Sequence, residues 1–430
     1  MNKRKKIAWP FIILMAFIVA VIVAGVTFSY FGGFGTGETA DIEEYAKYAG
    51  SVADITIPEN TKIVALGEAT HGNVEFQELK LDVFKVLVEN YGVRAFTLEG
   101  DCGGCEAVNR YINGGEGTAE EAAAAIGFAI YRTEQMADLI TWMREYNDSA
   151  PERDKLRFYG FDMQRTAYNH KYLMEGAKEL GVDVTELEKT WDDEAEDIDS
   201  EYDREKRAVI YEELKKELAK VNSTKAEYIA HFADILLQNI ELFTAYETGA
   251  SSSSKIRDGY MADNINWILK QEEKLGNNTI FVSAHIGHVE RHGTYGPDEK
   301  VTGNLLADDF GDQYFVIGTD FYKTKCNLRK GEGPKRVYKT FFSYDPLAKA
   351  SYKCGFDESY LDFSKIPDDS PLKNSVNEYT WMGSLGEAYS PLMAVIPMTY
   401  RIWRSPSELY DAMIYVSNAQ PIQVKYYEFS

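Results

Sequence analysis

Cysteine is scarce in this sequence, with four residues in a chain of 430. Four thiols in a chain of this length do not form the dense disulfide scaffold of a small secreted domain. Cys102 and Cys105 have the spacing of a redox motif, but thioredoxin-type function requires that pair at the start of a helix in a small separate domain. The sequence leaves two readings open here, a disulfide in a glycine-rich loop or two free thiols. Cys326 and Cys354 do not supply the second close pair that a zinc site needs.

Two motifs of common catalytic and nucleotide-binding sites are missing. The chain has no Gly-x-Ser-x-Gly elbow, which excludes the nucleophilic serine of α/β-hydrolases. It also has no Gly-x-x-x-x-Gly-Lys-Ser/Thr loop, which excludes a P-loop phosphate site. The hydrolytic chemistry that remains is attack by water, activated by a general base or by a metal ion.

Positive charge is in deficit, because 46 Lys and Arg face 68 Asp and Glu and give a formal net charge of −22. Binding to nucleic acid depends on cationic contacts to phosphates, so this balance excludes a nucleic-acid partner. It also argues against peripheral binding to anionic lipid. The acidic surface is best explained by solubility.

A single long stretch, residues 7–31, contains no charged residue. It is long enough for a helix that crosses a bilayer core, which needs roughly 20 apolar residues. Four basic residues precede it and predict a cytoplasmic N-terminus with an extracytoplasmic remainder. A cleavable signal peptide is the alternative, but its apolar core has about 7–15 residues and ends in small residues. We therefore expect a single-pass protein of the cell membrane, divided into a basic cytoplasmic end (1–6), a transmembrane anchor (7–31), a tether (32–38) and one extracytoplasmic domain (39–430).

Apolar runs that alternate with amphipathic segments predict an α/β fold. Residues 75–91 carry apolar side chains at helical spacing between two such runs, and this βαβ unit predicts parallel pairing. Residues from about 171 to 250 alternate charged and apolar side chains and predict a charged helical insertion. The fold class is a mostly parallel sheet flanked by helices. Strands are expected at 63–66, 94–98, 156–161, 279–284 and 314–319, with a last one at 393–397.

Histidine is also scarce, with six residues, yet four of them follow predicted strands. In open α/β sheets, ligands bind outside the carboxyl ends of the strands. If the predicted strands are neighbours in one parallel sheet, their polar ends share one cleft. The side chains expected to converge there are Glu68, His71, Glu99, Asp162, His285 and His288.

His71 is the best candidate for a general base. It stands in the segment Gly67–Gly72, where the flanking glycines permit tight turns and close approach of a ligand. Imidazole is well matched to accepting a proton from water near neutral pH. Glu68, three residues earlier, is placed to orient this ring or balance its charge. His285, His288 and His292 have metal-ligand spacing, so a metal-assisted hydrolase remains an alternative.

Several motifs in order resemble the signature of the erythromycin esterase family. The resemblance covers nearly the whole chain after the tether and reaches 410–413. One departure stands at Ile286, where the family has a polar residue between its two histidines. The segments that carry the resemblance are 67–72, Glu75-Phe76, Lys80, Leu98-Glu99, 108–111, 158–164, Arg257-Asp258, Met261, Asn264, Trp267 and 284–289.

The resemblance implies a hydrolase that opens an ester or a macrolide lactone by water attack, without a resident metal or other cofactor. It implies that the position of His71 is the general base and that the cleft holds a small-molecule substrate. The predicted catalytic residues are His71, Glu68, Glu99 and His285, and the predicted substrate-binding residues are Lys80, His288, Asp162 and Gln164. A ligand-binding protein without catalysis, built on the same fold, is the alternative from another class.

Overall fold

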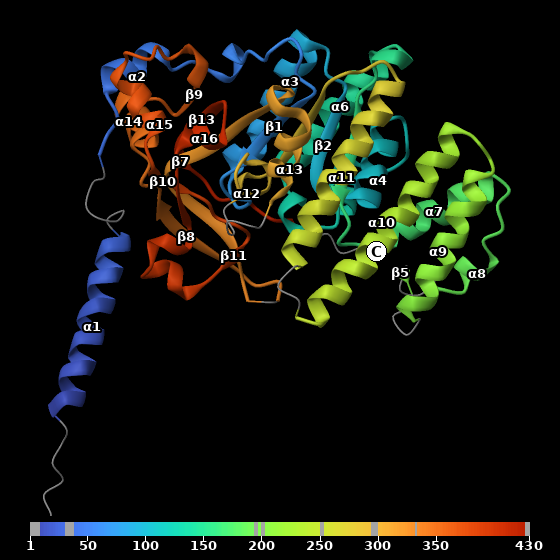
Figure 1. The fold of residues 1–430 in the computed structure, drawn as a ribbon, viewed down its shortest axis with the longest axis horizontal. Coiled ribbons are helices and arrows are strands. Elements are labelled where there is room, and N and C mark those ends of the chain that lie inside the picture. Colours follow the sequence, from blue (N-terminus) through green and yellow to red (C-terminus); the bar gives the residue numbers. More distant parts are fainter. Residues whose placement is uncertain are drawn as a thin grey trace, which may run out of the picture.

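The computed structural model describes residues 9–30, 38–192, 197–198, 203–249, 253–293, 300–331 and 333–425. Within these residues a nine-stranded mixed sheet forms the centre of the molecule (Figure 1). Its main path runs β3-β2-β6-β1-β7-β13-β9, and β8 and β11 pair with β7. The bounds of its strands are β1 Ile63–Glu68, β2 Ala95–Asp101, β3 Arg157–Asp162, β6 Ile280–His285, β7 Tyr314–Lys330, β8 Arg336–Phe342, β9 Glu358–Asp362, β11 Ala388–Tyr389 and β13 Ala412–Ala419.

The strands that the sequence predicted up to residue 319 are confirmed, and β1, β2, β3, β6 and β7 are parallel neighbours. β9 runs antiparallel to β13, and β8 runs antiparallel to β7. The predicted strand at 393–397 is wrong. This region forms 3₁₀ turns that begin at Pro391 and Pro397, and proline cannot donate to a strand ladder. Up to residue 425, where the described part of the chain ends, the last strand is β13.

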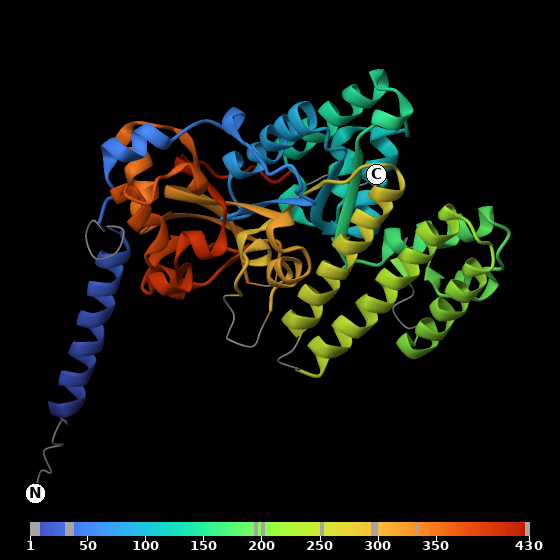
Figure 2. The same cartoon turned by 45° about the horizontal axis from the view of Figure 1, so that its top comes forward.

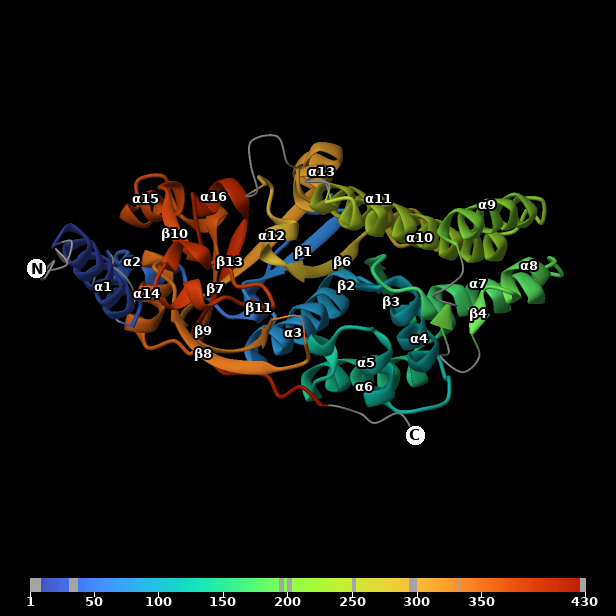
Figure 3. The ribbon, with the colours of Figure 1, turned by 90° about the horizontal axis from the view of Figure 1, so that it is seen from below.

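Helices cover both faces of the sheet, as Figure 3 shows. Side chains alternate along β1, so that Val64 and Leu66 enter one core and Ile63 and Ala65 enter the other. The first core is closed by α3 and α6, and the second by α11 and its neighbours. The helices around the sheet are α2 Ile42–Tyr48, α3 Val74–Tyr91, α4 Cys102–Ile112, α5 Ala119–Ala125, α6 Glu134–Ser149, α11 Ser253–Lys274, α12 Ile286–Val289, α13 Thr302–Phe310, α14 Pro346–Cys354, α15 Pro371–Asn377 and α16 Pro406–Leu409.

The charged insertion is helical, as its spacing predicted. It contains α7 Ala167–Glu179, α8 Thr185–Glu188, α9 Arg204–Ala219 and α10 Thr224–Glu247, with a two-stranded pair β4 Trp191–Asp192 and β5 Asp197–Ile198. Figure 2 shows these helices at the end of the molecule opposite α1. A second two-stranded pair, β10 Thr380–Gly383 with β12 Arg401–Arg404, lies near the C-terminal part of the sheet.

Most of the uncharged stretch 7–31 forms helix α1, Trp9–Tyr30. Among the described residues, no helix combines the length and the apolar character needed to cross a bilayer, so the predicted transmembrane anchor at 7–31 is not confirmed. The basic end (1–6) and residues 32–37 of the tether lie outside the described residues. The extracytoplasmic location stays a prediction.

All four cysteines are free. The loop reading of Cys102–Cys105 is wrong, because helix α4 begins at Cys102 and the Asp101 carboxylate accepts a hydrogen bond from Gly104 N at 2.8 Å. Burial raises the pKa of the Cys102 and Cys105 thiols well above their usual range. Thiols in this state are poor nucleophiles.

Candidate active site

The four predicted strand ends do meet at one edge of the sheet. β1 lies between β6 and β7, and the register pairs Glu68 with His285. β2 lies on the other side of β6 and carries Glu99, and β3 is the next strand. The rings of His71 and His285 have centroids 5.0 Å apart. The convergence of the two histidine segments is therefore confirmed.

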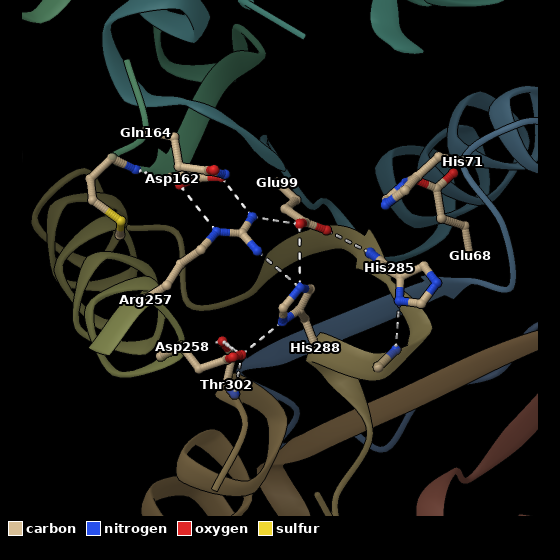
Figure 4. A network of polar contacts seen from close by, with 12 residues as sticks. Glu68, His71, Glu99, Asp162, Gln164, Arg257, Asp258, His285, His288 and Thr302 are labelled. Carbon is tan, nitrogen blue, oxygen red and sulfur yellow. Dashed lines mark hydrogen bonds and ion pairs between the residues drawn. The ribbon is translucent and has the colours of Figure 1, made fainter. Parts of the chain in front are cut away.

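His71 is held by a buried carboxylate. Its Nδ1 lies 2.7 Å from Oε1 of Glu68, on the last residue of β1 (Figure 4). The other oxygen of Glu68 accepts a hydrogen bond from Lys80 Nζ, and Lys80 on α3 also donates to the Phe76 carbonyl at 3.2 Å. Lys80 is completely buried and Glu68 is 2% exposed. The order Lys80–Glu68–His71 places a fixed cation behind the carboxylate that orients the imidazole.

In the Lys80–Glu68–His71 unit, the charges of neighbouring groups affect the pKa values of Glu68 and His71 more than burial does. Burial disfavours the charged form of Glu68, but the charges of Lys80 and His71 hold the pKa of Glu68 below its ordinary value. Burial also lowers the pKa of His71, but the Glu68 carboxylate overcomes it and raises the net pKa of His71. Glu68 is thus ionised in the folded protein and favours a proton on His71.

Arg257, near the start of α11, joins two buried carboxylates. Its Nη2 donates to Oε1 of Glu99 and to Oδ2 of Asp162, each at 2.7 Å. Gln164 Nε2 donates to the same Asp162 oxygen at 2.6 Å. Burial disfavours the Glu99 carboxylate, but the charges of His288 and Arg257 hold the pKa of Glu99 well below its usual range. Glu99 is therefore a permanent anion in the floor of the site.

His288 forms a second histidine–carboxylate pair. Its Nδ1 lies 2.7 Å from Oδ1 of Asp258, and its Nε2 lies 3.1 Å from Arg257 Nη1 and 3.5 Å from Glu99 Oε1. Asp258 also accepts hydrogen bonds from the backbone N and the hydroxyl of Thr302 at 3.0 and 2.8 Å. Burial lowers the pKa of His288, but Glu99 and Asp258 raise it above its ordinary value.

His285 stands between the two pairs and is neutral. Gly287 N donates to its Nδ1, so Nε2 carries the hydrogen and donates to the Leu385 carbonyl at 3.2 Å. Burial, together with the charges of His71 and His288, lowers the pKa of His285 to about 3. Its backbone N donates to Oε2 of Glu99 at 2.8 Å. The ring is therefore fixed in one tautomer.

A cavity of about 470 Å³ opens above these groups. This volume is within the range of small-molecule sites, about 300–1,000 Å³. His71, Glu99, Arg257, His285 and His288 line its floor. The opposite wall comes from the β10–β12 region, with Ser384, Gly386 and residues 398–402. The C-terminal part of the chain thus supplies one wall of the cleft.

The predicted site residues fall into two layers. His71, Glu99, His285 and His288 line the cavity, and Glu68 supports His71 from behind. Lys80 and Asp162 are completely buried behind Glu68 and Arg257, and Gln164 binds Asp162. The structure therefore places these three predicted substrate-binding residues in the supporting layer, where their contacts are to protein groups.

Sequence reasoning assigned no role to Arg257, Asp258 or Thr302. Arg257 and Asp258 stand next to each other in the sequence, which gives no sign that both side chains turn toward the sheet from α11. Their contacts depend on how α11 and α13 pack. Arg257 is 95 residues from its partner Asp162 in the sequence, and Asp258 is 44 residues from its partner Thr302. A surface helix also carries such charges, and the family resemblance includes Arg257-Asp258 without giving either residue a role.

The alternative metal site finds no support. Among the described residues, no group of three or more His, Cys, Asp or Glu is arranged to hold a metal ion. His285 and His288 have ring centroids 6.3 Å apart, and the nitrogens of both rings are used by protein partners. His292 is exposed beyond the end of α12.

Comparison with known proteins points to one family. The sequence model of the family described as Erythromycin esterase matches residues 88–419. An erythromycin esterase type II of Escherichia coli is 25% identical over 352 residues, which is 72% of this chain and 82% of that protein.

Solved structures share the fold. A crystal structure of a Bacillus cereus protein has a TM-score of 0.69 at 23% identity and covers 90% of this chain and 100% of its own. One described as a succinoglycan biosynthesis protein has a TM-score of 0.68 at 19% identity and covers 89% of this chain and 98% of its own. A mutant of the erythromycin esterase EreC in its open conformation has a TM-score of 0.57 at 16% identity and covers 89% of this chain and 98% of its own.

Proposed function

Because the chain belongs to the erythromycin esterase family, we propose that it hydrolyses an ester or lactone with water activated by His71. The observation that carries this proposal is the His71–Glu68 pair at the wall of the 470 Å³ cavity. With Nδ1 bound to Glu68, the Nε2 nitrogen is the one that can accept a proton from water. The relatives described as erythromycin esterases support a macrolide lactone as one candidate substrate.

The proposed reaction has two proton transfers. Water attacks the carbonyl carbon as His71 Nε2 takes one of its protons, and Glu68 stabilises the imidazolium that forms. The tetrahedral oxyanion then expels the alkoxide, and the carbon–oxygen bond of the ester breaks. The alkoxide receives a proton from His71 or from His288, whose pKa is raised by Glu99 and Asp258. The products are an alcohol and a carboxylic acid, which then releases its proton to solvent and becomes a carboxylate; for a lactone both groups remain on one opened molecule.

Positive charge near the oxyanion comes from Arg257 and from His288 in its protonated form. Both line the cavity, whereas Lys80 is buried against Glu68. His285 donates its ring hydrogen to Leu385, so its proposed part is to shape the floor and hold Glu99 through its backbone N. In this proposal Arg257 supplies the cavity-lining positive charge, and Lys80, which the sequence predicted to bind substrate, supports Glu68 instead.

A hydrolysis screen tests this function. Purified full-length protein is incubated with macrolides and with simple esters and lactones, and products are followed by mass spectrometry. The proposal predicts the mass of one added water for at least one lactone, or separate acid and alcohol from an ester. Ligands that raise the melting temperature without any product would instead support a binding protein on this fold.

Replacing Glu68 with glutamine is expected to shift the pH dependence of hydrolysis. His71 acts as a base only when neutral, so kcat/KM of the wild type rises with pH through a pKa above 6.5. Glu68→Gln removes the charge that raises this pKa, while burial still lowers it. The acidic limb of the kcat/KM profile should therefore move to lower pH, with a lower plateau. An unchanged limb would show that Glu68 does not control the ionisation of the base.

A further inference from the structure

The charged groups on the floor of the cavity are balanced by partners within the protein (Figure 4). Arg257 binds the carboxylates of Glu99 and Asp162. His71 and His288 each have a buried carboxylate on Nδ1, and Nε2 of His288 also lies 3.5 Å from Glu99. A charged ligand would have to compete with these partners. The floor therefore suits a neutral ester or lactone better than a charged one.

The wall opposite this floor has a different character. Met398, in the 3₁₀ turn Pro397–Thr399, and Ile402 on β12 both line the cavity. Met398 is 65% exposed and Ile402 is partly exposed. A side chain at Gly386, in the same wall, would meet no atom within 4 Å. The wall thus offers apolar surface and open space to a ligand that lies on the floor.

Arg401 belongs to the same wall, but its side chain is directed at the sheet. Its Nε and Nη2 donate to the Phe342 carbonyl at the end of β8, at 3.1 and 2.6 Å. The register pairs Arg401 with Gly383, and such opposite residues project to the same face. A side chain at Gly383 would meet Phe321 of β7. The guanidinium of Arg401 therefore faces β7 and β8, whereas Ile402, the next residue, projects from the other face.

We propose that Met398, together with Ile402, determines substrate specificity by binding an apolar group on the acyl or the alcohol side of a neutral ester or lactone. This inference rests on the proposed hydrolysis and names its substrate class. An apolar group that covers Met398 removes apolar surface from water on both molecules, which favours binding. A charged group in the same place would lose hydration and find no partner in Met398. Methionine is unbranched and adapts to different shapes, so this wall selects for apolar size.

Two series of neutral esters test the proposal with full-length protein. One series extends the acyl chain from acetyl to octanoyl with the alcohol held constant, and the other extends the alcohol from methyl to octyl. We expect the kcat/KM of the wild type to rise about two- to fourfold per buried methylene in one or both series. Met398→Ser should lower kcat/KM for the longest ester of that series by about tenfold or more, and Met398→Leu should keep it.

The matched control is Leu392→Ser. Leu392 is 54% exposed in the preceding 3₁₀ turn, outside the cavity lining, so this variant should keep the wild-type dependence on chain length. Equal kcat/KM across both series overturns the proposal, although hydrolysis of these esters would still support the proposed function. Faster hydrolysis of an ester with a terminal carboxylate than of the alkyl ester of equal length also overturns it.

Binding of methyl alkyl ketones supplies a readout that does not require turnover. A ketone keeps the carbonyl group but has no leaving group, so its affinity reports the wall alone. Isothermal titration calorimetry should show tighter binding of longer ketones to the wild type, and a much smaller gain with length in Met398→Ser. Affinity that does not change with length, or that changes equally in Met398→Ser, overturns the inference. Length-dependent affinity without hydrolysis of any ester would support the role of the wall and contradict the proposed function.

Discussion

Replacing His71 with alanine is expected to lower kcat/KM by about 10²–10⁴-fold, the range for loss of a general base. The reason is local: in the part of the chain that the structure describes, His71 is the one cavity-lining imidazole that has a carboxylate on Nδ1 and no recorded protein partner on Nε2. His285 donates to Leu385, and Nε2 of His288 faces Arg257 and Glu99. The measurement is steady-state hydrolysis of whichever ester or lactone the screen identifies.

The matched control for this variant is His292→Ala. His292 is exposed and follows the same histidine segment, so its removal tests the metal alternative and should leave the rate unchanged. Circular dichroism and melting temperature establish that His71→Ala is folded. Full activity in His71→Ala, or a loss in His292→Ala of similar size, would contradict the assignment of the base.

Replacing Lys80 with methionine is expected to reduce the free energy of unfolding by about 3–5 kcal/mol, because it leaves a buried carboxylate without its cation. Lys80 is completely buried and its Nζ donates to Glu68. Activity should also fall, since the support of Glu68 for His71 changes. Urea unfolding followed by circular dichroism measures the stability, and the double variant Lys80→Met, Glu68→Gln should recover part of it.

Lys62→Met is the comparison for the buried pair. Lys62 donates to Glu273 at 2.7 Å, but its side chain is 27% exposed and that of Glu273 is 39% exposed. Exposed ion pairs contribute about 0–1 kcal/mol, so Lys62→Met should have little effect. A loss of less than about 1 kcal/mol in Lys80→Met would place the Lys80–Glu68 pair in that same class.

The sheet and the convergence of its polar ends could be predicted because both follow from local pattern. Apolar runs of four to six residues separated by helical segments imply parallel strands, and parallel strands bring their carboxyl ends to one edge. Glu68 and His285 are therefore paired in register although 217 residues separate them. The scarcity of histidine made the two segments easy to recognise.

The partners of these residues could not be predicted in the same way. The positions of Arg257 and Asp258 depend on the packing of α11 against β3 and α13, which no short motif encodes. Lys80 did carry a local signal that it is buried and has a carboxylate partner. It stands four residues after Phe76 and four before Phe84, on the buried face of α3, where a lysine needs a buried acid.

The outer part of β7 was missed for another reason. The prediction ended at 319, where the apolar run ends, but the strand continues to Lys330. Over residues 323–326 it alternates the exposed Lys323 and Lys325 with the buried Thr324 and Cys326, and from Lys323 it pairs with β8. This alternation is typical of a strand with one solvent-exposed face. Because the segment contains polar residues, it does not form the apolar run that predicts a buried strand.

The most direct test is hydrolysis in H₂¹⁸O with mass spectrometry of the product. The account predicts one ¹⁸O atom in the new carboxylate when wild-type protein opens its ester or lactone, and almost no labelled product from His71→Ala. Labelled product at the wild-type rate from His71→Ala would contradict it, and so would a bound ligand that is recovered intact and unlabelled.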